Sequence, residues 1–147
     1  MKIIIDADGC PVVYETIEVA QNYGIKTLII SDTAHQFNIK DTPSIVVDRR
    51  PDAVDFEIIR HLKQNDLVVT QDYGLAAMVL AKKGFAISQN GLLYNDQNIE
   101  ALLLSRHHSQ KMRKAKVRLK SLKKRNAIDN QRYKEALCQC LKTIIQD

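Results

Sequence analysis

The sequence predicts a three-layer α/β/α fold with a mainly parallel sheet, followed by a C-terminal helical hairpin. Two observations support this prediction. Along residues 1–95, short apolar runs rich in β-branched residues alternate with amphipathic helical stretches, the pattern of a parallel sheet covered by helices. Residues 96–147 keep a helical period with no further strand-like run. A chain of 147 residues, 45% hydrophobic and 27% charged, has the size and composition of one domain spanning residues 1–147.

Each expected strand is a short apolar run, as is typical of the central strands of a parallel sheet. The dipeptide Asn90-Gly91 is a strong signal for a tight hairpin turn. It predicts that residues 92–94 return as one antiparallel edge strand. The expected parallel strands are Lys2–Ile5, Lys26–Ile30, Ile45–Val47, Leu67–Thr70 and Phe85–Ile87.

Three amphipathic stretches between the strands predict helices that cover the sheet. Pro11 stands where a first helical turn tolerates proline, and Gly24 stands where a C-cap is expected. In the second stretch, Phe56, Ile59 and Leu62 share one helical face and are expected to be buried. The three helices are expected over residues 11–24, 52–64 and 73–83.

The last third of the chain predicts two helices that turn near residues 126–128 and dock on the sheet domain. Asp96 stands where the first of them can be capped. Each helix has one narrow apolar stripe, consistent with a helix that packs on one side only. The stripes are Met112, Ala115, Leu119 and Leu122 in the first helix, and Tyr133, Leu137, Cys140 and Ile144 in the second.

The net charge of +5 is distributed unevenly along the chain. Residues 1–100 are net acidic, whereas residues 101–128 contain ten Lys or Arg and no Asp or Glu. Cations without acidic partners repel one another and favour an external polyanion, so we expect the basic segment, residues 106–125, to bind nucleic acid. It has no aromatic side chain for base stacking, which favours phosphate contacts. The expected contacts are Lys111, Arg113, Lys114, Lys116, Arg118, Lys120, Lys123, Lys124 and Arg125.

The three cysteines predict neither a zinc site nor a disulfide scaffold. Cys10, Cys138 and Cys140 lack the spacing of a metal motif, and their number is odd. The apolar run at the N-terminus is short and is followed at once by acids, unlike a signal peptide, and no long apolar stretch follows. We therefore expect a cytoplasmic protein with reduced thiols and no membrane contact.

Acidic residues follow the predicted strands at the edge where ligands bind in open parallel sheets. Asp6 and Asp8 follow the first strand, Asp32 the second and Asp72 the fourth, while Asp55 lies in the first turn of a helix. Carboxylates brought together repel one another and are most simply reconciled by a divalent cation. Oxygen ligands favour Mg²⁺ or Mn²⁺. The sequence therefore predicts a metal site at this edge.

A structural interpretation of these acids competes with the metal site. Asp52 and Asp72 stand where helix N-caps are wanted, and Asp48 is suited to a surface turn. Asp6 is the exception, because an acid directly after the apolar run Ile3–Ile5 is costly to bury unless a charge compensates it. Asp6 is therefore the leading functional candidate.

The segment Asp6-Ala7-Asp8-Gly9 resembles the first motif of haloacid-dehalogenase-like phosphatases. That resemblance implies Asp6 as the phosphoryl-accepting nucleophile and Asp8 as the general acid and base, with Ser31 imitating the second motif. The following residues are Cys10-Pro11 where that family has threonine, and no clear lysine with paired acids follows. The match is therefore local.

A second resemblance covers nearly the whole chain. The segments carrying it are Asp6-Ala7-Asp8-Gly9-Cys10-Pro11-Val12, Ser31-Asp32-Thr33-Ala34-His35, Asp52-Ala53-Val54-Asp55, the run from Asp66 to Ala76, Ser105-Arg106 and Arg132-Tyr133. They resemble the bacterial YaiI/YqxD family, which is similar in pattern to PIN-like nucleases.

The PIN-like resemblance implies a function and a set of site residues. It implies that three carboxylates bind a metal ion and are catalytic: Asp6, Asp55 and Asp72. Asp8 would either bind a second metal ion or contact the side chains that bind the first. PIN-like nucleases usually add a Glu on an intervening helix, for which this chain has no convincing equivalent. Under this resemblance, either Asp32 or Asp8 fills that role, or the site is incomplete. Substrate contacts are expected from Ser31, Asp32, His35, Thr70 and Arg106.

Three functions stay open from the sequence. The first is a divalent-metal-dependent nuclease acting on RNA through the carboxylate cluster. The second is a small phosphatase of the haloacid-dehalogenase type with Asp6 as nucleophile. The third is a nucleic-acid-binding protein whose acidic site is not catalytic.

Overall fold

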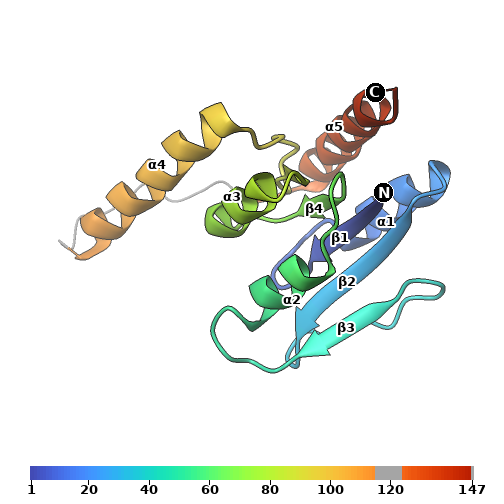
Figure 1. Ribbon diagram of the computed structural model, residues 1–147, viewed down its shortest axis with the longest axis horizontal. Helices are drawn as coiled ribbons and strands as arrows, with labels where there is room; N and C mark the ends of the chain where they lie inside the picture. The colour runs from blue at the N-terminus through green and yellow to red at the C-terminus, as the bar shows by residue number, and fades with distance from the viewer. Residues whose placement is uncertain (115–123, 147) are drawn as a thin grey trace.

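A five-stranded, all-parallel sheet forms the centre of the molecule (Figure 1). The computed structural model describes the backbone of residues 1–114 and 124–146, and the side chains of residues 1–106 and 124–146. Every predicted parallel strand is present, with ends shifted by at most two residues. The strands are β1 (Lys2–Asp6), β2 (Lys26–Asp32), β3 (Ser44–Val47), β4 (Leu67–Val69) and β5 (Phe85–Ile87), in the order β3-β2-β1-β4-β5.

The helices cover both faces of the sheet and confirm the three-layer prediction. One face is covered by α1 (Val13–Asn22) and α5 (Ala127–Gln146). The other is covered by α2 (Ala53–His61), α3 (Tyr73–Ala81) and the first turns of α4 (Asp96–Lys114). None of the described helices is long and apolar enough to cross a membrane.

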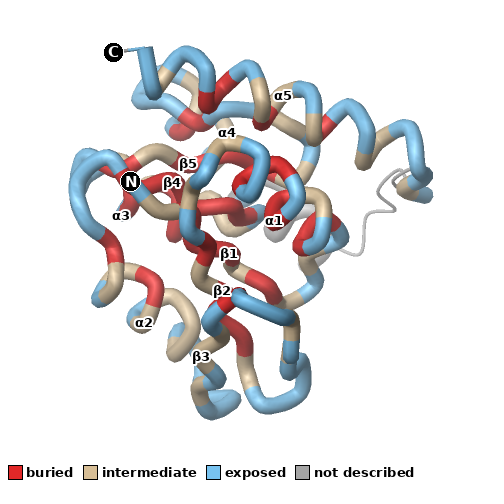
Figure 2. Tube along the Cα trace, turned by 90° about the vertical axis from the view of Figure 1, so that its right-hand side faces the viewer, coloured by how far each residue is buried: buried red, intermediate tan, exposed pale blue. Residues whose placement is uncertain are grey.

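Successive side chains of β1 point to opposite faces of the sheet, so β1 contributes to the apolar core on both faces. Ile3 and Ile5 point into the layer under α1 and α5, whereas Ile4 points into the layer under α2 and α3. All three side chains are fully buried, and Figure 2 shows burial concentrated on the central strands. Tyr133 of α5 completes the first layer through a buried 2.7 Å hydrogen bond between its hydroxyl and Thr16 of α1.

The C-terminal helices differ from the predicted hairpin in their packing. They follow one another along the chain, but α4 packs against α3 and α5 packs against α1, on opposite faces of the sheet (Figure 1). The physical reason is that each face of the sheet has its own apolar surface to cover. The caps are local: Asn95 accepts hydrogen bonds from the first backbone N–H groups of α4, and Asn126 does the same for α5.

Two further expectations were wrong. The turn at Asn90-Gly91 forms, but residues 92–94 return as one isolated bridge, between Ile87 and Leu93, rather than as an edge strand. Of the three apolar residues expected to share a face, Leu62 is buried and Ile59 is partly buried, but Phe56 is 71% exposed, and Ile58 is the fully buried residue of α2. The sheet surface selects a face of α2 rotated away from the one that sequence spacing indicated.

The acidic residues collect where the strands end, as expected for a parallel sheet. Asp6 is the last residue of β1 and lies opposite Ile30 of β2, while Asp32 is the last residue of β2. The loops after β1, β2 and β4 and the first turns of α2 and α3 meet at this edge. This edge holds the candidate site.

Candidate metal centre

Two adjoining cavities form an acidic cleft at the carboxyl edge of the sheet. The larger, about 460 Å³, is lined by Asp6, Asp8, Asp72 and Arg106 among others. The smaller, about 220 Å³, is lined by Asp8, Asp55 and Asp72 together with neighbouring polar residues. Because Asp8 and Asp72 line both cavities, the cavities adjoin, and together they contain the four predicted catalytic carboxylates.

Asp6 is one of two acids of the cleft whose pKa is strongly raised. Burial, with smaller contributions from the negative charges of Asp8 and Asp72, raises the pKa of its carboxyl to about 6. The hydroxyl of Thr70 opposes this by donating a 2.6 Å hydrogen bond to Oδ2 of Asp6. The carboxylate is therefore held in place but costly to ionise.

Thr70 positions two parts of the cleft. Its buried hydroxyl donates to Asp6 and accepts a 3.0 Å hydrogen bond from the backbone N–H of Asp72. Thr70 also fixes the chain through its carbonyl, which accepts a hydrogen bond from the hydroxyl of Tyr94. The hydroxyl of Thr70, predicted to contact substrate, already donates one hydrogen bond and accepts another within the protein. In this structure it positions Asp6 and Asp72.

Asp72 caps a helix, as one interpretation of the sequence expected, and also lines the cleft. Its Oδ1 caps α3 by accepting a 3.1 Å hydrogen bond from the backbone N–H of Leu75. The same oxygen lies 3.6 Å from Nη1 of Arg106, at the mouth of the cleft. A Cβ on Gly74 would come within 3.3 Å of this oxygen, so the absence of a side chain at position 74 leaves room for the pair.

Asp55 projects from the first turn of α2 toward the same cleft. Burial raises the pKa of its carboxyl to about 6, helped by the negative charges of Asp72, Asp6 and Asp52. Asp52, expected to cap α2, occupies the N-cap position with a positive φ of 65° and no side-chain capping bond. The first turn of α2 therefore contributes a carboxylate to the cleft rather than a cap.

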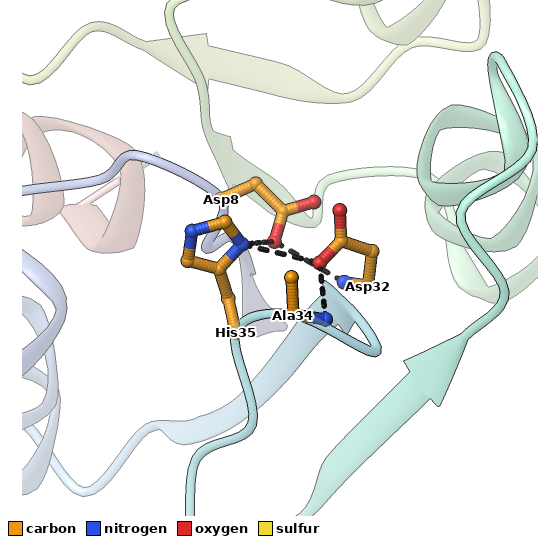
Figure 3. A network of polar contacts seen from close by, with 4 residues as sticks. All are labelled: Asp8, Asp32, Ala34 and His35. Atoms are coloured by element: carbon orange, nitrogen blue, oxygen red, sulfur yellow. Dashed lines mark hydrogen bonds and ion pairs between the residues drawn. The ribbon is translucent and has the colours of Figure 1, made fainter.

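A second group of possible ligands lies on the β2 side of the cleft (Figure 3). Nδ1 of His35 lies 3.1 Å from Oδ1 of Asp32 and 3.4 Å from Oδ1 of Asp8. Oδ1 of Asp8 also accepts a 3.1 Å hydrogen bond from the backbone N–H of Asp32, and the contact with His35 lowers the pKa of Asp32. Their ligand atoms all lie within 4.8 Å of one another, so this group could hold a metal ion.

The predicted metal ligands are more widely spaced than this group. Among the described residues, Asp6, Asp55 and Asp72 line one cleft without all their ligand atoms lying within 4.8 Å of one another. Like charge keeps such carboxylates apart. Asp8 is the residue that links the two sets.

The family follows from a match that extends beyond these motifs. Residues 4–143 match the model described as "Uncharacterized BCR, YaiI/YqxD family". The chain belongs to the YaiI/YqxD family. The UPF0178 protein of Exiguobacterium sibiricum is 45% identical over 141 residues, which cover 96% of this chain and 96% of that relative. Those of Ruminiclostridium cellulolyticum and Alkaliphilus oremlandii are 42% and 39% identical, over 97% and 96% of this chain and 93% and 91% of theirs.

The family resemblance expected from the motifs is thus confirmed. The names of these relatives state no activity, so the resemblance to PIN-like nucleases stays a prediction. No solved structure matches the chain.

Two other predicted site residues of this YaiI/YqxD protein, Ser31 and Arg106, and the cysteine that follows the acidic loop lie as follows. Ser31 is fully buried, and its hydroxyl has no hydrogen-bond partner among the described residues. Arg106 is half exposed and lines the larger cavity. Cys10 lines the same cavity, and burial raises the pKa of its thiol to about 11, which suits a structural cysteine better than a nucleophile.

The predicted nucleic-acid contacts are described only in part. Lys124 is exposed. Arg125 is engaged within the protein: its guanidinium donates to Oδ1 of Asn130, Oδ1 of Asn90 and the carbonyl of Gln89, at 2.6–2.7 Å. The other predicted contacts, Lys111, Arg113, Lys114, Lys116, Arg118, Lys120 and Lys123, have side chains that lie outside the described residues.

Sequence reasoning missed several residues that line the cleft. Gln71, Tyr73 and Gln89 border the larger cavity, and Gln71 Oε1 accepts a 3.0 Å hydrogen bond from the backbone N–H of Gln89. Gln71 and Tyr73 flank Asp72 in the chain, so their position beside a strand end was an available signal. Gln89 had no such signal, because the turn after β5 reaches the cleft only through tertiary contacts.

Proposed function

We propose that this YaiI/YqxD protein is a divalent-metal-dependent nuclease that acts on RNA. The main support is the convergence of Asp6, Asp55 and Asp72 on one cleft from three different elements. The pKa of both Asp6 and Asp55 is raised to about 6, so ionisation of the cleft at neutral pH costs stability. A divalent cation between the carboxylates would offset that cost.

The donor set suits Mg²⁺ or Mn²⁺, held by Asp6, Asp55 and Asp72. Bound there, the ion would hold a scissile phosphate, lower the pKa of a bound water and stabilise charge on the leaving oxygen. Thr70 already hydrogen-bonds Oδ2 of Asp6, so Oδ1 of Asp6 is the proposed ligand atom. The Asp8–Asp32–His35 group, which includes an imidazole nitrogen, is the candidate for a second ion and favours Mn²⁺ over Mg²⁺.

Two sources of positive charge favour a polyanionic substrate. Arg106 stands at the mouth of the cleft, where its guanidinium can pair with a phosphate oxygen. The rest of the basic segment, residues 107–125, adds nine further Lys or Arg residues, with no Asp or Glu between residues 101 and 128. The choice of RNA over DNA comes from the resemblance to PIN-like nucleases.

The test is cleavage of a fluorescently labelled single-stranded oligoribonucleotide by the full chain with Mn²⁺, Mg²⁺ or excess chelator. We expect cleavage that chelator abolishes, and a loss of at least about 100-fold in Asp6→Asn, since removing a principal catalytic group costs several kcal/mol. Asp41→Asn is the matched control, because Asp41 is exposed and lies before β3 begins, at the opposite edge of the sheet. Metal-independent cleavage, or equal loss in both variants, would contradict the proposal.

The haloacid-dehalogenase alternative differs from the nuclease in that it forms a covalent intermediate. Asp6 and Asp8 line one cavity, as that chemistry requires, but no lysine is among the described residues lining it. A phosphatase would form a covalent phosphate ester on Asp6, detectable by mass spectrometry after trapping with a phosphate mimic. Phosphate trapped on Asp6 would replace the nuclease proposal, whereas binding of RNA without any cleavage would support the non-catalytic alternative.

A further inference from the structure

An exposed phenylalanine stands beside the proposed metal ligands. Phe56 directly follows Asp55 in α2 and is 71% exposed, although the spacing of apolar residues placed it on the buried face. Leaving a Phe side chain in water forgoes about 2 kcal/mol of burial free energy. A single exposed apolar residue is ordinary, so the surroundings of Phe56 decide whether it has a role.

Phe56 forms one wall of a cavity that continues from the cleft. This cavity, about 390 Å³, also contains Met78, Leu75, Asp55, Asp72 and Arg106. Met78 of α3 is 42% exposed and supplies a second apolar side chain. Asp72 and Arg106 belong to the larger acidic cavity as well, so the apolar walls adjoin the carboxylates directly.

This arrangement matches the chemistry of a nucleotide. An aromatic ring beside a thioether offers an apolar surface for a flat nucleobase. The guanidinium of Arg106, in the same cavity, can pair with the phosphate that joins this base to the next. Stacking on an aromatic side chain tolerates every base, because every base has a π-face.

We propose that Phe56 is the stacking platform for the nucleobase next to the scissile phosphate, and that it restricts the enzyme to single-stranded substrates. The inference rests on the proposed nuclease function and adds the strand requirement. A base within a duplex is already stacked on its neighbours and does not reach a side-chain platform, whereas a base in a single strand does. Phe56 and Arg106 thereby receive the base and the phosphate of one nucleotide.

The test measures binding separately from cleavage. A fluorescein-labelled single-stranded oligoribonucleotide and its duplex are titrated against the full chain with Ca²⁺, an oxygen-seeking cation, in place of Mn²⁺. Phe56→Ala should weaken binding of the single strand roughly 5- to 100-fold, the usual loss for one stacked base. Phe56→Trp should preserve binding, Phe56→Leu should fall between them, and Phe56→Ala should leave the weaker duplex binding unchanged.

Tyr14→Ala is the matched control. Tyr14 is an aromatic residue of similar exposure, 66%, but it lies on α1, across the sheet from α2. Tyr14→Ala should bind the single strand with an affinity within about 2-fold of wild type, as for most surface substitutions. Thermal unfolding of each variant checks that it folds; Phe56→Leu and Phe56→Trp retain an apolar side chain if Phe56→Ala does not fold.

The outcomes separate the two proposals. If the wild-type chain cleaves single-stranded RNA but Phe56→Ala matches Tyr14→Ala in binding and in KM, the stacking inference fails and the nuclease stands. If the chain binds single strands through Phe56 but never cleaves, the stacking site stands and the nuclease fails. Equal binding of duplex and single strand, or no RNA binding at all, overturns the inference and makes Phe56 a candidate contact for a protein partner.

Discussion

The hydroxyl of Thr70, directly after β4, donates a 2.6 Å hydrogen bond to the carboxylate of Asp6, at the end of the adjacent strand β1. The same hydroxyl accepts from the backbone N–H of Asp72, so one buried side chain sets the relative positions of two acids. Donation to the carboxylate stabilises its charged form and lowers the pKa that burial raises. Thr70 is therefore the positioning residue of the cleft.

Replacing Thr70 by valine should raise the pH required for activity. The variant keeps the shape of the side chain but loses the hydrogen bond that lowers the pKa of Asp6. The acidic limb of the pH–rate profile for Mn²⁺-dependent cleavage should move upward, and well below pH 6 the rate should fall about 10-fold for each unit of movement. Thr70→Ser should restore the profile.

Thr27→Val provides the control for this prediction. Thr27 is a buried residue of β2, away from the carboxyl edge, so its substitution tests the effect of a β-branched apolar replacement alone. If the acidic limb moves equally in Thr70→Val and Thr27→Val, Thr70 acts only through stability. The same conclusion follows if Thr70→Ser does not return the limb to its wild-type position.

Replacing Asp6 by asparagine should stabilise the protein above pH 6. The pKa of Asp6 is about 6 in the folded chain and 3.8 ordinarily, so the folded chain holds more protons between these values. Stability therefore falls as pH rises through that window, and the cost, at most about 3 kcal/mol at 1.36 kcal/mol per unit, persists above it. The neutral amide of the Asp6→Asn variant would lack this cost, while its carbonyl oxygen could still accept the hydrogen bond from Thr70.

Urea unfolding of the two proteins at pH 8 and near pH 4 checks this expectation. Asp6→Asn should be more stable by roughly 1–3 kcal/mol at pH 8 and nearly equal to wild type near pH 4. Mn²⁺ should stabilise wild type more than the variant at pH 8, because an ion that binds only the folded chain adds stability. A difference that is the same at both pH values would exclude Asp6 ionisation as its cause.

Replacing Arg125 by alanine should reduce stability rather than nucleic-acid binding. Its guanidinium joins the Gln89–Asn90 turn to Asn130 at the beginning of α5. Losing these charge-assisted contacts should cost about 1–3 kcal/mol in urea unfolding, with little change in the salt dependence of RNA binding. Lys124→Ala, at the exposed neighbouring position, should cost less than about 0.5 kcal/mol. Equal stability of both variants would contradict the structural role of Arg125.

Neutralising Lys114, Lys116 and Lys120 together should weaken RNA binding through its electrostatic component. If each contacts one phosphate, the slope of log affinity against log salt should flatten by up to about three units, at roughly 0.9 per contact. The measurement is a salt titration of the binding constant for wild type and variant. An unchanged slope would identify the basic segment as a solvated surface.

The strands and the acidic edge could be predicted because their signals are local or follow from topology. A parallel strand that is buried on both faces needs several consecutive apolar residues. The sequence contains such runs at Ile3–Ile5 and Leu67–Val69, and both are buried. Once the strands are parallel, their carboxyl ends share one edge, so Asp6 and Asp72 meet without any further information.

Helix faces and long-range contacts could not be predicted in the same way. The spacing of Phe56, Ile59 and Leu62 is helical, but the side that α2 buries depends on the sheet surface beneath it, which selected Ile58 and Leu62. In the sequence, Arg125 looks like one more cation of the basic segment. Its structural role is visible only in the fold, where the Gln89–Asn90 turn lies beside it.

By itself the sequence determined the family, the five strands and the carboxylates that line the cleft, because apolar period, caps and strand ends are encoded within a few residues of one another. Only the tertiary structure decided how these groups are coupled: that Thr70 holds Asp6, that Asp8 joins Asp32 and His35, and that Phe56 stands exposed beside Asp55. Such couplings join residues far apart in the chain, and their geometry depends on which surfaces the packed sheet leaves uncovered.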